Sequence, residues 1–283
     1  MKSATGRRRA LGPTLGREPK GKSLDALVAF ALKLAAESGK ILGPANARRP
    51  QVELKADRSL VTRIDKRIER RLRGLIAARY PDHGILGEEA GGTNVEADLL
   101  WVIDPIDGTA PFVAGIPVFG TLIAVLYRGT PIIGIIDHPV TRDRWVGVRG
   151  RATTRNGVRC KTRRCPGVKD ALLSASNPDF FGPSDRPGFE ALRSRTQWRI
   201  YGGSCFSYGL LASGRTDIAI DTGLSIHDYA AFRPVIEGAG GVITDWNGAP
   251  ITIETGKRIL AAGDAARHKD ALALVQAAMK PKR

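Results

Sequence analysis

The sequence predicts an α/β protein that is α+β in its N-terminal half and α/β in its C-terminal half. Three observations support this prediction. Before about residue 165, two helical stretches precede a series of strand-like runs. Beyond it, strand-like and helical runs alternate, as they do in α/β folds. The length of 283 residues is enough to bury a substantial core, in one large domain or in two.

Two amphipathic helices are expected first. Over 23–38, the apolar residues recur at helical spacing. A second helix is expected to begin at Thr62, because Thr62-x-x-Asp65 resembles a capping box with a shorter acid. The apolar stripe of this helix includes Ile68 and Leu72, and Pro81 follows its end.

Strand-like runs dominate the stretch that follows these helices. They lie at about 84–87, 99–103, 118–127, 131–137 and 144–149. Short turns at 128–130 and 141–142 separate the last three runs, so these strands are expected to pair as antiparallel neighbours.

The pattern changes to alternation near residue 165. Strands are expected at 171–175, 198–201, 216–220, 241–244 and 258–262, and helices at 186–196, 205–213, 227–239 and 265–279. The expected organisation is a disordered basic extension, 1–22, an N-terminal α+β domain, 23–165, and a C-terminal α/β domain, 166–283.

The formal net charge of +16 is concentrated in two short segments. Residues 1–22 hold seven Lys or Arg and one Glu, and residues 149–164 hold seven more without an acid. This pattern indicates appended basic surfaces and argues against a fold built around nucleic acid. The run 149–164 is expected to be a solvated hairpin, with a surface for anionic partners as the alternative.

Membrane and secreted classes of protein are not indicated. No apolar run approaches the length that spans a bilayer. Ala10-Leu11-Gly12-Pro13 interrupts the N-terminal stretch before a hydrophobic region forms, so no secretory signal is expected. The three cysteines form no paired framework, and a reducing cytoplasm is the expected setting.

The most informative stretch is 99–109. Its apolar part, 99–103, indicates a buried strand that delivers Asp104 and Asp107 to its C-terminal end. Gly108 permits a close turn, and Thr109 can open a short helix whose free N–H groups attract an anion. Acids beside a phosphate cradle would repel phosphate unless divalent cations lay between them, so the stretch predicts a metal-assisted phosphate site. The alternative is an Asx turn at the strand end.

These residues resemble a known family. Asp104-Pro105-Ile106-Asp107-Gly108-Thr109, with Gly87-Glu88-Glu89 before it and His227-Asp228 and 237–241 after it, is similar to the motifs of the inositol monophosphatase family. The motifs stand in the order of that family, and the resemblance covers about 23–275. The stretches 112–123 and 134–140 most resemble its histidinol-phosphatase branch.

The resemblance implies a layered α-β-α-β-α sandwich and a magnesium-dependent, lithium-sensitive phosphomonoesterase. It also implies a pair of Mg²⁺ ions held by oxygen ligands, which are the ligands that this ion prefers. The implied ligands are the carboxylates of Glu88, Asp104, Asp107 and Asp228 and the carbonyl of Ile106. Because most of them lie in 23–165, that part is the expected metal-binding domain.

The resemblance also implies catalytic roles. Glu88 is expected to help to hold the attacking water, and Asp65 and Thr109 are expected to form a hydrogen-bonded pair that orients it. The backbone N–H groups of Gly108 and Thr109 are expected to hold the phosphate.

The substrate expectation is L-histidinol phosphate, a small phosphorylated metabolite. Ser204 and Asp221 match family positions that approach the leaving group. Because Ser204 stands where this branch often carries Asp, Asp221 is the acid left to pair with the amine of the substrate.

Two alternatives stay open at this point. One is an inositol-1-phosphate or broad sugar-phosphate phosphatase, and the other is an RNA-associated regulator that keeps the fold and uses its basic segments. The resemblance also suggests a homodimer, with no membrane partner.

Overall fold

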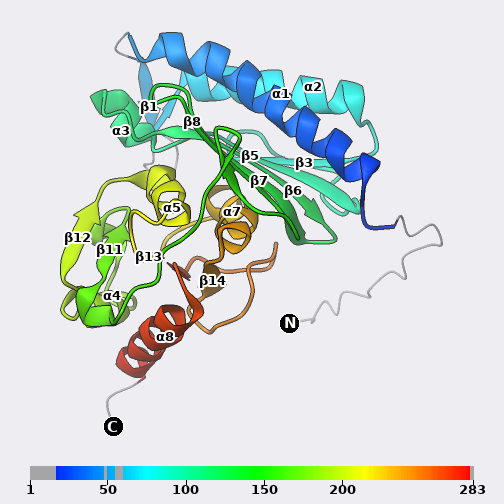
Figure 1. The fold of residues 1–283 in the computed structure, drawn as a ribbon. Helices are drawn as coiled ribbons and strands as arrows, with labels where there is room; N and C mark the ends of the chain where they lie inside the picture. The colour runs from blue at the N-terminus through cyan, green and yellow to red at the C-terminus, as the bar shows by residue number, and fades with distance from the viewer. Residues whose placement is uncertain (1–16, 48–49, 55–59, 281–283) are drawn as a thin grey trace, which may run out of the picture.

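A computed structural model describes residues 17–47, 50–54 and 60–280 (Figure 1). Of the extension expected at 1–22, residues 1–16 lie outside the described residues, whereas Lys22 begins the first helix.

Two N-terminal helices form an outer layer. Helix α1 (Lys22–Ala45) continues almost two turns beyond its expected end, and α2 (Arg63–Arg79) follows the short antiparallel pair β1 (Val52–Leu54) and β2 (Leu60–Thr62). The predicted capping box of α2 is confirmed, because the side chain of Thr62 caps the first turn and Asp65 accepts from the backbone N–H of Thr62.

A mixed sheet of eight strands lies under these helices. From one edge to the other, its strands are β10 (Val158–Arg159), β9 (Thr154–Arg155), β8 (Asp143–Val148), β7 (Thr130–His138), β6 (Gly120–Tyr127), β5 (Leu99–Asp107), β3 (Gly84–Gly87) and β4 (Gly91–Thr93). Only β3 and β5 pair in parallel. The predicted antiparallel neighbours β6, β7 and β8 are confirmed.

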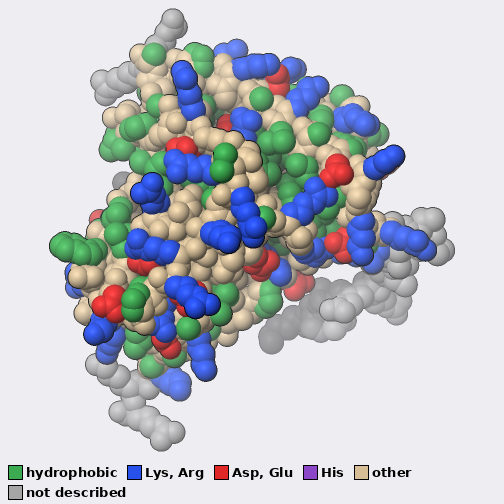
Figure 2. Space-filling model, viewed as in Figure 1, with side chains coloured by type: hydrophobic (Ala, Val, Ile, Leu, Met, Phe, Trp, Pro, Cys, Tyr) green, Lys and Arg blue, Asp and Glu red, His purple; other side chains and the backbone are tan. Residues whose placement is uncertain are grey.

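The basic run 149–164 contains the β9–β10 hairpin, as expected, with Asn156 and Gly157 at positive φ in its turn. Most of its arginines are paired with acids: Arg149 with Glu18, Arg151 with Asp25, Arg155 with Asp143 and Arg163 with Asp217. Lys and Arg are spread widely over the face seen in Figure 2, with acidic side chains between them. The run is therefore largely compensated within the chain.

A second, smaller mixed sheet follows. Its strands, in order, are β12 (Trp198–Tyr201), β11 (Leu172–Ala175), β13 (Ile218–Asp221), β15 (Ile259–Ala262) and β14 (Val242–Asp245). The first three strands pair in parallel. Strand β15 is antiparallel to β13, and β14 is antiparallel to β15.

The helices of the C-terminal half cover this sheet on both faces. They are α4 (Arg186–Arg193), α5 (Ser204–Ala212), α6 (Ile226–Tyr229), α7 (Phe232–Ala239) and α8 (Ala265–Met279), with short 3₁₀ turns at Val168–Asp170 and Pro178–Phe180. The single helix expected over 227–239 is therefore wrong. Pro234 has no N–H to donate to the carbonyl of Ala230, so the helical ladder is interrupted between α6 and α7.

Five layers result, in the order α, β, α, β, α (Figure 1). Along β5, Trp101 and Ile103 pack into the cluster under α1 and α2, whereas Leu100 and Val102 pack into the cluster around α5 and α7. Burial on both faces explains why this strand is continuously apolar. A third cluster lies between the smaller sheet and the pair α4 and α8. The layered sandwich expected from the resemblance is confirmed.

The two sheets divide near residue 165, since all strands of the larger one precede it and all strands of the smaller one follow it. One buried cluster joins both halves, and the division into two domains stays a prediction. Among the described residues, we find no helix whose length and apolar character would let it cross a membrane.

Candidate metal and phosphate site

The site begins at the end of β5. This strand does not stop at residue 103 as expected but runs to Asp107, with a shift of its register against β6 between Asp104 and Asp107. Pro105 lies within the shift, and because proline has no N–H it interrupts the ladder of hydrogen bonds. The irregularity lets both carboxylates reach one cavity.

Backbone amides hold both carboxylates. Asp104 is 1% exposed, and its Oδ1 accepts from the N–H of Ile106 at 3.0 Å. The Asx turn is therefore present as well as the acid cluster. Oδ2 of Asp107 accepts from the N–H of Cys205 at 2.6 Å, at the start of α5. Asp104 is thus fixed within the β5 segment, and Asp107 is fixed by a helix of the C-terminal half.

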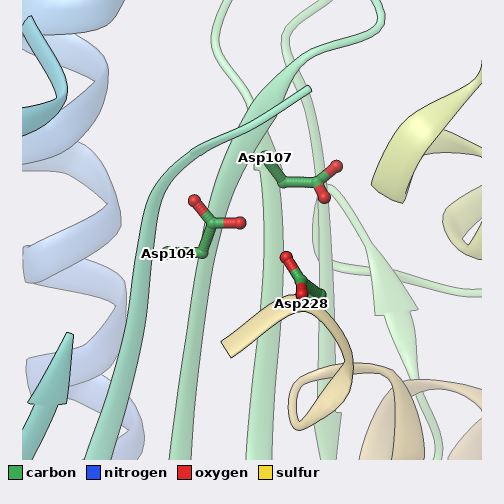
Figure 3. A group of neighbouring side chains, drawn as sticks. All are labelled: Asp104, Asp107 and Asp228. Carbon is green, nitrogen blue, oxygen red and sulfur yellow. The ribbon is translucent and has the colours of Figure 1, made fainter. Parts of the chain in front are cut away.

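Asp228 completes the cluster from α6, where its Oδ2 accepts from the N–H of Ser225 at 2.6 Å. One carboxylate oxygen from each of Asp104, Asp107 and Asp228 lies within 4.8 Å of the others. Figure 3 shows the three side chains approaching a common space, two from the β5 segment and one from the short helix.

Burial and mutual repulsion disfavour the charged forms of these acids. Burial, followed by the charges of Glu88, Asp107 and Asp228, raises the pKa of Asp104 well above its usual range. Burial, followed by the charge of Asp228, also raises the pKa of Asp107. A cation placed between the carboxylates would reverse both effects.

Glu88 lines the same cavity, directly after β3, and its N–H donates to the carbonyl of Ile103 at 3.2 Å. A hydrogen bond between the Glu88 and Asp104 side chains also contributes to the raised pKa of Asp104. The structure therefore brings four of the expected ligands together, with Ile106 in the same cavity wall.

Glu69 on α2 positions this segment and was missed by the sequence analysis. Its carboxylate, 1% exposed, accepts from the N–H groups of Glu89 at 2.7 Å and Ala90 at 2.9 Å. A Cβ on Gly87 would lie 2.2 Å from Oε1 of Glu69, so a larger residue there would displace this carboxylate. The available signal was an acid beside the apolar stripe of α2, next to Ile68.

The expected hydrogen bond between Asp65 and Thr109 is not formed, which is a correction. Oδ2 of Asp65 accepts from the N–H and the hydroxyl of Thr62, at 2.8 and 2.5 Å, and the Thr109 hydroxyl donates to the carbonyl of Ile106 at 3.1 Å. The capping box and the β5 turn thus engage both groups locally. Oδ1 of Asp65 is buried and has no hydrogen-bond partner among the described residues.

Gly108 and Thr109 form the turn into α3 (Thr109–Ala114), the short helix that the sequence predicted. Gly108 has φ 84°, which favours glycine, and a Cβ there would lie 2.7 Å from Oγ of Ser204. Ser204 has a positive φ of 44° and lines the cavity with Gly108 and Thr109. The close approach holds the candidate phosphate turn against the first turn of α5.

Asp221 does not line the cavity, so its expected contact with substrate needs correction. It is 2% exposed, and its oxygens accept from the N–H of Ser176 at 2.7 Å and the hydroxyl of Tyr208 at 2.8 Å. Burial raises its pKa to about 6. The carboxylate therefore supports the cavity wall from behind.

The cavity has a volume of about 800 Å³. Its charged lining residues within the described part of the chain are all acids, and its remaining lining residues are Leu60, Ile106, Gly108, Thr109, Ala110, Pro111, Ser176, Asn177, Pro178, Phe180, Tyr201, Gly202, Ser204, Thr222, Gly223 and Leu224. Clustered carboxylate oxygens with a nearby carbonyl suit a hard divalent cation such as Mg²⁺. The residues present therefore fit the expected metal.

Comparison with known proteins gives a consistent result. Residues 23–280 match the model of the inositol monophosphatase family. The chain is 41% identical over 258 residues to the chloroplastic bifunctional phosphatase IMPL2 of Arabidopsis thaliana, covering 88% of this chain and 75% of that protein. It is 35% identical over 207 residues to the histidinol-phosphatase of Mycobacterium tuberculosis, covering 70% of this chain and 78% of that protein.

A solved structure shows the same architecture. An inositol monophosphatase from Zymomonas mobilis superimposes with a TM-score of 0.83 at 36% identity, covering 90% of this chain and all of that one.

Proposed function

Since the chain belongs to the inositol monophosphatase family and is a phosphoric monoester hydrolase, we propose that its cofactor is Mg²⁺ and its substrate L-histidinol phosphate. The observation that carries the proposal is the group of three carboxylates whose oxygens lie within 4.8 Å of one another. Burial and repulsion leave this group unfavourably charged, which is the condition that divalent cations relieve.

The proposed metal ligands are all oxygen atoms: those of Glu88, Asp104, Asp107 and Asp228 and the carbonyl of Ile106. When bound, Mg²⁺ polarises the phosphoryl group and generates a nucleophile from water near neutral pH. Backbone amides fix the carboxylates of Asp104, Asp107 and Asp228, so these three need little reorganisation on binding.

The remaining groups orient the reactants in this proposal. Glu88 holds the attacking water, and the unpartnered Oδ1 of Asp65 is available to accept a hydrogen bond from it. The N–H groups of Gly108 and Thr109 receive the phosphate at the start of α3. These roles place hydrogen-bond donors where negative charge develops.

Similarity to the M. tuberculosis histidinol-phosphatase supports the narrower substrate. The nearest rival is an inositol-1-phosphate or broad sugar-phosphate phosphatase, which similarity to the Z. mobilis enzyme favours. An RNA-associated regulator is less well supported, because most arginines of the basic run 149–164 are already paired with acids. We also propose that the protein forms a homodimer. We further propose that it works in a reducing cytoplasm, with which its three free cysteines are in keeping.

The test is release of inorganic phosphate by the purified chain across a substrate panel. L-histidinol phosphate, inositol 1-phosphate and glycerol 2-phosphate are compared with Mg²⁺, with EDTA and with added lithium. We expect turnover only with Mg²⁺, inhibition by lithium, and the largest kcat/KM for L-histidinol phosphate. Equal or faster cleavage of inositol 1-phosphate would exclude the narrower substrate, and undiminished turnover in EDTA would exclude the metal.

A further inference from the structure

We propose that Phe180 and Tyr201 form an aromatic subsite that selects leaving groups carrying a planar or cationic ring. The subsite lies in the part of the cavity wall that the smaller sheet contributes, apart from the carboxylates. The inference rests on the proposed phosphomonoesterase function, and it assigns the recognition of the leaving group to residues that the motifs do not contain.

The topology places the two rings at one edge. Tyr201 ends β12, where it pairs with Ala175 at the end of β11, and Phe180 ends the 3₁₀ turn that follows β11. Because β11 and β12 are parallel, their carboxyl ends meet at the same edge of the sheet, where ligands of such sheets bind. Both residues line the cavity of about 800 Å³ that holds the acids.

The ring of Phe180 makes no ring contact within the described residues, and the ring of Tyr201 is tilted against the buried ring of Phe189, at 6.2 Å between centroids. Phe180 is 58% exposed and Tyr201 is 40% exposed, whereas Phe181, the next residue in the chain, is fully buried and stacks on Phe189 at 4.2 Å between ring centroids. The hydroxyl of Tyr201 makes no hydrogen bond within the described part of the chain. The exposed parts of both side chains are therefore left at the wall of a polar cavity, where they suit a ligand ring.

The acids of the cavity are already assigned, which leaves recognition of the leaving group to other lining residues. All four acids that line it are proposed metal ligands, and Asp221 is engaged behind the wall. Among the described lining residues, no carboxylate is left to bind a cationic leaving group. The aromatic side chains remain available to it through cation–π contacts. An imidazole ring fits this wall in both of its protonation states, because the neutral form is a flat ring and the protonated form is also a cation.

Two polar side chains on this wall that a polyol leaving group could use are already engaged within the chain. Oδ1 of Asn177 already accepts from the N–H of Asp179 at 2.9 Å, and the hydroxyl of Thr222 donates to Asp185. Phe180 also lines an adjoining cavity of about 550 Å³, together with Thr222 and Gly223. Phe180 thus lies between the two cavities, where a leaving group that extends beyond the phosphate would pass.

The test replaces the aromatic faces and keeps the apolar bulk. Phe180→Leu, Tyr201→Leu and the double variant are assayed with L-histidinol phosphate and glycerol 2-phosphate. We expect the ratio of the two kcat/KM values to fall about 3- to 10-fold in each single variant, the range given by aromatic and cation–π contacts. Phe180→Tyr and Tyr201→Phe keep an aromatic ring at each position, and both should retain the wild-type ratio.

Trp198→Leu is the matched control. Trp198 lies on the same strand and is 65% exposed, but it does not line the cavity. Its replacement should leave the ratio at the wild-type value. A double variant with an unchanged ratio, or a Trp198→Leu variant with the same loss as Tyr201→Leu, would overturn the subsite.

A second readout separates this proposal from the proposed substrate. L-histidinol and myo-inositol are compared as inhibitors of glycerol 2-phosphate hydrolysis, which requires only a working phosphomonoesterase. We expect L-histidinol to inhibit more strongly, and its inhibition constant to rise in the double variant. If L-histidinol phosphate is not cleaved but this pattern holds, the subsite stands and only the substrate assignment fails. Equal inhibition constants in wild type and double variant would overturn the subsite whatever the substrate.

Discussion

Buried acids occur in two regions of this molecule, and the chain treats them differently. Asp217, at the start of β13, is 2% exposed and accepts from both Nε and Nη2 of Arg163 at 2.7 Å. Asp137 on β7 is 4% exposed and accepts from Arg144 at 2.6 Å. Asp104 and Asp107 form no ion pair within the described residues and are held by backbone amides instead.

The difference separates structural acids from site acids. At Asp217 and Asp137 the buried carboxylate is compensated by an arginine of the same chain, because an uncompensated buried charge is strongly destabilising. At the end of β5 the chain adds further acids and no Lys or Arg among the described cavity-lining residues. Such an arrangement stores unfavourable charge that a ligand from outside the chain can relieve.

The largest effect is expected for Asp104→Asn. This change removes the most buried carboxylate of the cluster, so phosphate release should fall by more than about 100-fold, because even residues that only support metal ligands cost 10–100-fold when lost. The free energy of unfolding in EDTA should rise, since repulsion with Asp107 and Glu88 is relieved.

Thermal unfolding of the wild type and Asp104→Asn with and without Mg²⁺ checks both parts. The wild type should gain stability with Mg²⁺, by about 3 kcal/mol at a hundredfold excess over Kd, and the variant should gain less. A variant that stays fully active, or one that is destabilised in EDTA, would contradict the contrast between the two kinds of acid.

Asp221→Asn tests an acid that belongs to neither group. Its native pKa is about 6, against 3.8 for the ordinary group, so between these pH values the native state binds more protons than the unfolded state. The free energy of unfolding of the wild type should therefore fall as pH rises from 4 to 6, by up to about 3 kcal/mol from this residue. The Asn variant should lack that slope.

Urea unfolding in EDTA at pH values from 4 to 8 measures the free energy of unfolding of the wild type and of Asp221→Asn. The titration of the site acids is common to both proteins, so the difference between them reports on Asp221. Because Asp221 lies behind the cavity wall, the KM of Asp221→Asn for L-histidinol phosphate should change little. A large rise in KM with an unchanged pH slope would restore the direct contact with substrate that the sequence suggested.

Glu69→Gln should sharpen the role of a buried acid that supports a ligand. Glu69 anchors the N–H groups of Glu89 and Ala90, so its replacement should loosen Glu88 and lower kcat/KM about 10- to 100-fold. The Mg²⁺ concentration for half-maximal activity should rise as well. Glu37→Gln is the control, because Glu37 pairs with Lys40 and Arg71 on the exposed side of α1 and should leave both values unchanged. Equal effects of the two changes would show that Glu69 has no special role.

Local patterns explain what the sequence could predict. The capping box at Thr62, the hairpins between β6, β7 and β8, and the acids that follow the apolar run of β5 all depend on neighbours within a few residues. The meeting of Asp228 with Asp104 and Asp107 spans more than a hundred residues, and only the family resemblance made it predictable.

Tertiary contacts explain what the sequence could not predict. Glu69 reads as a surface residue among arginines until β3 packs against it, and Asp221 reads as a site acid until Tyr208 and Ser176 engage it. The separation of α6 from α7 follows from Pro234, a local signal that the apolar periodicity masked. For Glu69 and Asp221, the missing information was which group lies opposite the side chain in the folded protein.

The smallest effect, and the opposite of that at Asp104, is expected for Asp217→Asn. Asp217 accepts two bonds from Arg163 and one from the N–H of Leu172, so it ties the segment after β10 to β11 and β13. Asn keeps one acceptor, and we expect the free energy of unfolding to fall by about 1–2 kcal/mol in urea titrations. The kcat/KM and the stabilisation by Mg²⁺ should stay within about twofold of wild type, because distant sites act independently. If Asp217→Asn weakened Mg²⁺ binding while leaving stability intact, acids paired with arginine would no longer be distinguishable from the acids of the site.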